Sequence, residues 1–179
     1  MGYSFDQVFR AEYVPLRAYL YKRVGNPLAD DLAAETFAIA YRRWDDLDPL
    51  RPVRPWLYGI SANLLSHHWR KERRRLHALA RSGADPTDPE DEAVLERADA
   101  HAQRRALAAA LAGLRHDDRE VLLLHAWGYL GDAEIAEALT IPVGTVKSRL
   151  HRAREQMENL LAANGQVEAM EDLIPTAEP

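Results

Sequence analysis

Apolar residues recur along this chain at intervals of three and four positions, which is the spacing of one face of an α-helix. The first such series is Phe5, Phe9, Tyr13, Leu16, Leu20 and Val24. No segment shows the alternation of apolar and polar residues that indicates a half-buried strand. The pattern therefore predicts an all-α protein.

Breaks in this pattern divide the first half of the chain into three predicted helices. The sequence Gly25-Asn26-Pro27 ends the first helix, and the second has Ala33, Phe37, Ala40 and Trp44 on one face. Prolines at 49, 52 and 55 follow in a predicted loop, because proline and the residue before it disfavour helix. A third helix is predicted to begin near Trp56 and to run into the basic segment 70–75.

An acidic segment then separates two halves of different organisation. Residues 82–92 read SGADPTDPEDE and lack large apolar side chains, which is typical of a linker. Beyond it, Leu107, Leu111 and Leu114 mark a fourth helix. This succession of segments predicts two small helical domains, 1–81 and 100–160. A flexible acidic linker at 82–99 joins them, and an acidic tail follows at 161–179.

The second domain is predicted to contain four helices. Asp117 has Glu120 three residues later, which indicates a helix N-terminus with a capping box before a helix from Val121 to about Trp127. A short helix from Asp132 to Leu139 and a longer one reaching at least Met157 are separated by Thr140-Ile141-Pro142.

The last two helices fit a helix-turn-helix. Ala136 provides the small residue on the first helix, Ile141 the apolar turn, and Val146 and Leu150 the buried positions one turn apart. Pro142 suits a first helical position. The remaining side chains face outward together and suit base edges and phosphates in a major groove; they are Thr145, Lys147, Ser148, Arg149 and Arg152. The alternative is an ordinary helical hairpin with a solvated basic face.

A polar stripe on the third helix is the second candidate site. Asn63, His67, Arg70 and Arg74 lie at steps of three and four residues, with Trp56 and Trp69 nearby. Aromatic rings among cations suit single-stranded or melted nucleic acid, because bases stack while the backbone is neutralised. The alternative is that the tryptophans belong to the core and the arginines to a solvated face.

The net charge of −5 hides two basic blocks. Residues 1–81 carry a net +5 and residues 100–154 a net +2, whereas 82–99 and 155–179 each carry −6. The chain has no cysteine, so disulfides and thiolate metal sites are excluded. His67 and His68 are neighbours that cannot chelate one metal from one helix face, and no catalytic or phosphate-loop motif occurs. We expect no enzymatic activity, no cofactor, no membrane insertion and a cytoplasmic location.

Three segments together resemble the extracytoplasmic-function (group four) sigma factors of bacterial RNA polymerase. They are DDLAAETF at 30–37, RPWLYGISANLLSHHWRKERRR at 54–75 and PVGTVKSRLHRAR at 142–154. Other helix-turn-helix regulators share only the third segment. The family implies two helical domains, no chemistry of their own, and binding to core RNA polymerase and promoter DNA.

The resemblance assigns roles to three sets of residues. The polymerase-docking set is Asp31, Glu35 and Arg42. The set that captures the melted minus-ten element is Asn63, His67, Arg70, Lys71, Arg73 and Arg74. The set that reads the minus-thirty-five duplex is Pro142, Thr145, Lys147, Ser148, Arg149 and Arg152.

Two further expectations depart from the family pattern. Thr140 stands where the family often carries glycine, which costs about 1 kcal/mol if the turn needs a positive φ, unless the turn is rearranged. In the tail, Val167, Met170 and Ile174 suit a short amphipathic helix that folds back and restrains activity; a solvated tail is the alternative. Control by an anti-sigma protein, by the tail or by expression level stays open.

Two other functions remain as alternatives at this point. One is a free-standing helix-turn-helix regulator that binds duplex DNA without polymerase, and the other is a helical adaptor that binds an acidic protein. The acids of the second helix favour the sigma factor, because an independent repressor has no use for a polymerase-docking face.

Overall fold

The computed structural model describes residues 4–48, 50–82 and 98–163, and these residues are helical apart from short connections. The first domain contains α1 (Phe5–Val24), α2 (Leu28–Arg42), the 3₁₀ helix η1 (Trp44–Asp46) and α3 (Val53–Ser82). The second domain contains α4 (Ala98–Gly113), α5 (His116–Ala126), α6 (Asp132–Leu139) and α7 (Val143–Ala163). The prediction of an all-α protein is confirmed for this part of the chain.

Local sequence explains both ends of α1. Ser4 forms a capping box with Gln7, in which the Gln7 amide donates to the Ser4 hydroxyl over 3.3 Å and the Ser4 amide donates to Gln7 Oε1 over 3.1 Å. Gly25 ends the helix with φ of +68°, a conformation that favours glycine. The predicted break at 25–27 is confirmed.

The first domain packs α1, α2 and α3 around an apolar core. Two predicted boundaries are wrong. Trp44 lies in η1 rather than on α2, where its ring packs edge-on against Phe5. The helix α3 begins at Val53 and contains Pro55 in its first turn, where a missing N–H has no helical partner to lose.

The second domain is built around α5. Its residues Val121 and Leu122 are fully buried, and the helix packs mainly against α7. The prediction that a capping box at Asp117 and Glu120 starts this helix is wrong, because α5 begins at His116 and Arg115 is its N-cap. Both carboxylates instead make ion pairs with distant arginines, Asp117 with Arg149 and Glu120 with Arg23.

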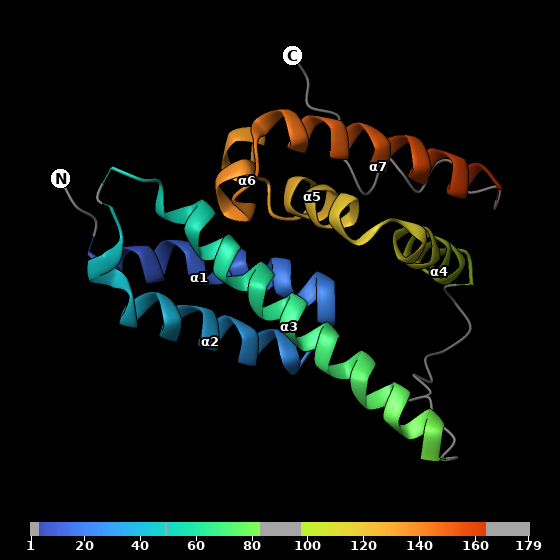
Figure 1. Cartoon of the computed structure of the whole chain (residues 1–179), viewed down its shortest axis with the longest axis horizontal. Coiled ribbons are helices and arrows are strands. Elements are labelled where there is room, and N and C mark those ends of the chain that lie inside the picture. Colours follow the sequence, from blue (N-terminus) through green and yellow to red (C-terminus); the bar gives the residue numbers. More distant parts are fainter. Residues whose placement is uncertain (1–3, 49, 83–97, 164–179) are drawn as a thin grey trace.

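The two domains pack against each other through α3 and α6, a contact that the sequence does not predict (Figure 1). Gly59 of α3 approaches so closely that a Cβ there would lie 2.6 Å from the carbonyl oxygen of Ala138. Beside it, the Arg54 guanidinium donates to the carbonyl oxygen of Gly128 over 2.8 Å. The second domain therefore sits directly on α3.

The predicted linker and tail fall largely outside the described residues. The acidic segment 83–97 and the tail residues 164–179, which include Val167, Met170 and Ile174, are not described. The domain limits, the tether and the folded-back tail stay predictions.

Candidate nucleic-acid interface

The helix-turn-helix is formed by α6 and α7 as predicted. Ala136, Val146 and Leu150 are buried, with exposed fractions of 7%, 0% and 4%. Ile141 in the turn packs partly buried against the same core. The side chains that hold α7 in place therefore all point inward, and the opposite side of α7 is left for a ligand.

The turn between these helices places Thr140 in the left-handed region, with φ of 55° and ψ of 48°. Of the two possibilities left open at this position, a positive φ and a rearranged turn, the structure shows the positive φ. The Ile141 amide donates to the carbonyl oxygen of Ala136 over 2.9 Å, which closes the end of α6. Pro142 stands directly before α7 rather than at its first position, and its carbonyl accepts from the Thr145 and Val146 amides.

The predicted outward set does lie together at the beginning of α7. Pro142, Lys147, Ser148 and Arg152 are exposed, and Thr145 and Arg149 are half-buried. The Ser148 hydroxyl donates to the carbonyl oxygen of Thr145 over 3.0 Å. Two side chains of this set are held by the neighbouring helix α5.

Acids at the beginning of α5 bind both of these arginines. Arg149 donates to Asp117 over 2.7 Å, and Arg152 donates to both carboxylate oxygens of Asp118 over 2.8 and 3.3 Å. The Asp118 side chain is only 3% exposed. Its hydrogen bonds are the main reason that the pKa of Arg152 is raised. Sequence reasoning missed the role of these acids, since their offsets of 32 and 34 residues follow no local pattern.

The polar stripe on α3 is exposed along its length. Asn63, His67, Arg70 and Arg74 all face solvent, as does Lys71, whereas the Arg73 side chain is outside the described set. The two tryptophans do not flank this stripe together. Trp56 is half-buried and packs next to Trp44. Trp69 lies thirteen residues after Trp56, is 41% exposed and packs against His68. Trp56 thus shares a cavity with Asn63, and Trp69 is exposed between His67 and Arg70 in the sequence.

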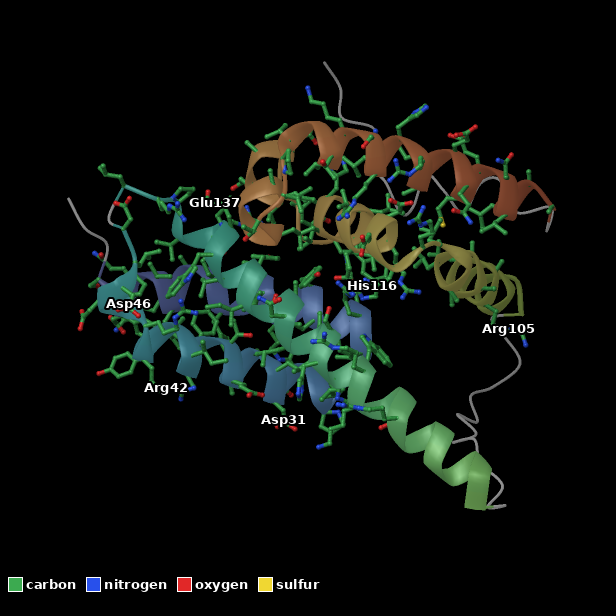
Figure 2. All side chains as sticks on the ribbon, viewed as in Figure 1. Asp31, Arg42, Asp46, Arg105, His116 and Glu137 are labelled. Atoms are coloured by element: carbon green, nitrogen blue, oxygen red, sulfur yellow. The ribbon has the colours of Figure 1, made fainter. Side chains whose placement is uncertain are left out.

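Asn63 lines a cavity of about 420 Å³ between the domains. Trp56 and Ile60 of α3 form one side, and the segment from Arg43 to Arg51 forms another. The remaining side comes from Glu137 and Ala138 of α6 and from Thr140 directly after it; Figure 2 labels Glu137. We call this space the Asn63 cavity. Arg43 and Arg51 are cations that sequence reasoning did not assign to it, because they precede α3 in an irregular segment.

The acidic side of α2 separates into paired and unpaired carboxylates. Asp30 binds Arg17 of α1 with both oxygens, and that hydrogen bonding holds the pKa of Asp30 below its usual value. Asp31, Glu35 and Arg42 are exposed and make no ion pair among the described residues. Figure 2 shows Asp31 and Arg42 on the outer side of α2, away from the second domain. The predicted docking set therefore shares one accessible face.

In the described ranges, no group of three His, Asp or Glu side chains could hold a metal ion. No helix there is long and apolar enough to cross a membrane.

Comparisons with known proteins agree with this geometry. Residues 8–75 match the family model for Sigma-70 region 2, and residues 104–157 match Sigma-70 region 4. The RNA polymerase sigma-E factor of Streptomyces coelicolor is 30% identical over 94% of this chain and 92% of its own. The ECF RNA polymerase sigma factor SigW of Bacillus subtilis is 34% identical over 79% of this chain and 80% of its own.

A solved structure has the same arrangement of helices. CnrH, determined in complex with the cytosolic domain of CnrY, superposes with a TM-score of 0.64 over 89% of this chain and 88% of that one, at 28% identity. These matches support a sigma factor rather than the free-standing regulator. The chain belongs to the extracytoplasmic-function sigma factors, which bind core RNA polymerase and direct promoter-specific transcription initiation.

Proposed function

We propose that three separate faces carry out initiation: α2 docks on core polymerase, α3 captures the melted minus-ten element, and α7 reads the minus-thirty-five duplex. In this division, residues 1–81 and 100–160 are the working domains and 82–99 is their tether. The chain performs no catalysis and acts in the cytoplasm. The observation that carries the proposal is on α2: Asp30 is paired with Arg17 of α1, whereas Asp31 and Glu35 stay exposed.

On α2, only part of the acidic cluster is available to a partner. Asp30 is already bound by Arg17, whereas Asp31 and Glu35 are exposed. An exposed carboxylate pair with Arg42 beside it suits a charged helical surface on another protein, because complementary charges guide and orient association. Asp31, Glu35 and Arg42 form the polymerase-docking face.

On α3, Asn63 binds an unstacked base in the Asn63 cavity, and Trp56 supplies an aromatic surface beside it. Its half-buried ring leaves part of its face accessible. The cations along the helix neutralise the strand backbone; they are His67 when protonated, Arg70, Lys71, Arg73 and Arg74. Trapping extruded bases in this way offsets the cost of unpairing, about a few kcal/mol.

On α7, Arg149 and Ser148 contact base edges, while Lys147 and Arg152 hold phosphates. Thr145 and Pro142 lie at the end of the helix that enters the groove, as in other helix-turn-helix proteins. The solved complex of CnrH with the cytosolic domain of CnrY motivates a further partner. We include in the proposal that an anti-sigma protein binds this chain.

A binding assay with core polymerase tests the docking face. Asp31→Arg combined with Glu35→Arg should weaken binding to core enzyme by at least about tenfold, because like charges at an interface cost several kcal/mol. The control is Asp6→Arg, which reverses one exposed carboxylate on α1 that pairs with Arg10. Circular dichroism should show the same helicity for all three proteins. Equal affinities of the double variant and the control for core enzyme would contradict the proposal.

A further inference from the structure

Two acids at the beginning of α5 hold arginines of α7, and they are exposed to very different degrees. Asp117 and Asp118 follow His116, the first residue of α5 (Figure 2). Asp117 accepts from Nη2 of Arg149 over 2.7 Å, and its side chain is 57% exposed. Asp118 accepts from both Nε and Nη2 of Arg152, and its side chain is 3% exposed. Of these two carboxylates, only that of Asp117 is open to a duplex bound along α7.

The Arg149 guanidinium keeps unused donors while it is bound to Asp117. A guanidinium carries five N–H donors in one plane, and among the described residues the Arg149 side chain uses Nη2 alone. Nη2 has one hydrogen beside Nε and another beside Nη1. Whichever of the two hydrogens binds Asp117, a pair of parallel N–H groups stays available on the other edge.

This available edge suits a base in the major groove. A guanine presents two neutral acceptors there, O6 and N7, and an arginine binds both with two parallel N–H groups. Arg149 can make this contact without releasing Asp117. Its side chain is only 20% exposed and is tied to α5, so it loses little freedom when it binds. Asp117 therefore positions a pair of donors rather than blocking it.

A phosphate meets a different situation at Arg149. It is an anion, so it competes with the Asp117 carboxylate for the same cation, and exchanging one anion for the other gives little net stabilisation. If Asp117 stays bound, its exposed charge repels the phosphate. The neutral acceptors of a base do not meet this repulsion. Asp117 should therefore weaken a phosphate contact of Arg149 more than a base contact.

We propose that Asp117 is a specificity-determining residue for the upstream duplex and that it acts through Arg149. It holds the guanidinium with one edge available to a guanine, and it keeps phosphates away from that guanidinium. Asp117 lowers the affinity for every duplex, but it lowers that for wrong sequences most, because specificity is a difference of affinities. This inference rests on the proposed role of Arg149 in reading base edges.

The test removes the charge of Asp117 and keeps its shape. The variant is Asp117→Asn, and the matched control is Glu158→Gln, which removes the same charge at an exposed position of α7 nine residues after Arg149. His116 Nδ1 lies 3.5 Å from the second carboxylate oxygen of Asp117. Binding is therefore measured at about pH 8, where an ordinary histidine is neutral.

The assay uses the chain bound to core RNA polymerase and two promoter fragments that differ only in the upstream element. One fragment is selected by the parent holoenzyme from a library randomised at that element, and the other is a scrambled version of it. Asp117→Asn should bind the scrambled fragment more tightly and the selected one nearly as before. The preference should fall at least about threefold relative to Glu158→Gln, within the range for an exposed ion pair. Salt dependence on the scrambled fragment should steepen by about one counterion, because Arg149 gains a phosphate.

Three further measurements separate positioning from a structural role. In an Arg149→Ala background, Asp117→Asn should leave the preference unchanged, because the side chain through which it acts is gone. Asp117→Glu keeps the charge and should retain most of the preference of the parent. The urea midpoint of Asp117→Asn should match that of Glu158→Gln, so a change of preference cannot come from a less stable fold.

Three results would overturn the inference: an unchanged preference in Asp117→Asn, an equal gain on both fragments, or the same loss of preference in the Arg149→Ala background. An equal gain would make Asp117 a repulsive charge only, and a loss without Arg149 would mean that Asp117 contacts a base itself.

Failure of the proposed function gives a different pattern. If Arg149→Ala by itself kept the preference of the parent, the base-reading assignment of Arg149 would be wrong, and the inference with it. If Arg149→Ala lost the preference while Asp117→Asn kept it, the assignment would stand and the inference alone would be wrong.

Discussion

The two helices assigned to DNA, α3 and α7, present their cations in opposite ways. On α3, Arg70, Lys71 and Arg74 are exposed and make no ion pair among the described residues. On α7, Arg149 and Arg152 are each held by an acid of α5. The cations of α3 are therefore solvated, whereas those of α7 are oriented by ion pairs.

This difference fits the two kinds of DNA. A single strand varies in shape, so its phosphates have no fixed positions for which a cation could be oriented in advance. A duplex presents fixed positions in its major groove, and an arginine whose plane is already oriented loses less side-chain entropy on binding. The acids have a cost, because DNA must compete with Asp117 for Arg149.

The largest expected effect is on α7. Arg149→Ala should weaken binding to the preferred upstream duplex by about 1–3 kcal/mol and reduce the preference for that sequence. Lys147→Ala is the comparison, because an exposed lysine that holds a phosphate should weaken all sequences alike. Titrations of matched and scrambled duplexes with both variants measure the difference. A uniform loss with Arg149→Ala would show that this side chain does not read bases.

Local sequence was sufficient to predict most of the fold. The spacing of Ala136, Ile141, Val146 and Leu150 predicted the helix-turn-helix, because those positions must be buried whatever surrounds them. The conformation of Thr140 was left open, because the sequence alone does not decide between a positive φ and a rearranged turn. The resemblance to sigma factors supplied the roles of the exposed side chains, because helical spacing predicts which side chains are buried but not what the exposed ones bind.

Long-range ion pairs could not be predicted in the same way. Asp117 and Glu120 have the spacing of a capping box, but their carboxylates bind Arg149 and Arg23 from other helices. A local pattern gives the possible hydrogen bonds of a side chain, whereas tertiary packing decides which one forms. The contact of Gly59 with α6 escaped prediction for the same reason.

The next effect concerns α3, the helix whose cations are not held by acids. Asn63→Ala should weaken binding to a single-stranded minus-ten oligonucleotide by up to about 1.5 kcal/mol, the range for one hydrogen bond. Binding to the upstream duplex should not change, because Asn63 lies on α3 and does not belong to the set on α7 that is assigned to that duplex. The melting temperature should also stay the same. Equal losses for both DNAs, or a large drop in melting temperature, would favour a structural role for Asn63.

A smaller effect should follow when Arg152 on α7 is no longer oriented by Asp118. Asp118→Ala deletes a nearly buried carboxylate but leaves the half-exposed Arg152 hydrated, so unfolding free energy should fall by only about 1 kcal/mol. Arg152 then gains freedom and behaves like the cations of α3. We expect weaker duplex binding with the same dependence on salt, measured by titration from low to high ionic strength. A steeper salt dependence would mean that Arg152 contacts a phosphate only when Asp118 is absent.

The smallest effect is expected in the turn that sets the angle of α7. Thr140 has a positive φ without being glycine, so Thr140→Gly should release backbone strain in the folded state. Glycine also raises the conformational entropy of the unfolded chain, which offsets part of this stabilisation. The net increase in unfolding free energy should be about 0.5 kcal/mol, measured in urea. Thr140→Ala is the control, because it removes the hydroxyl but keeps the strained φ, and it should give no increase. If both variants were stabilised equally, the benefit would come from the lost side chain rather than from the backbone.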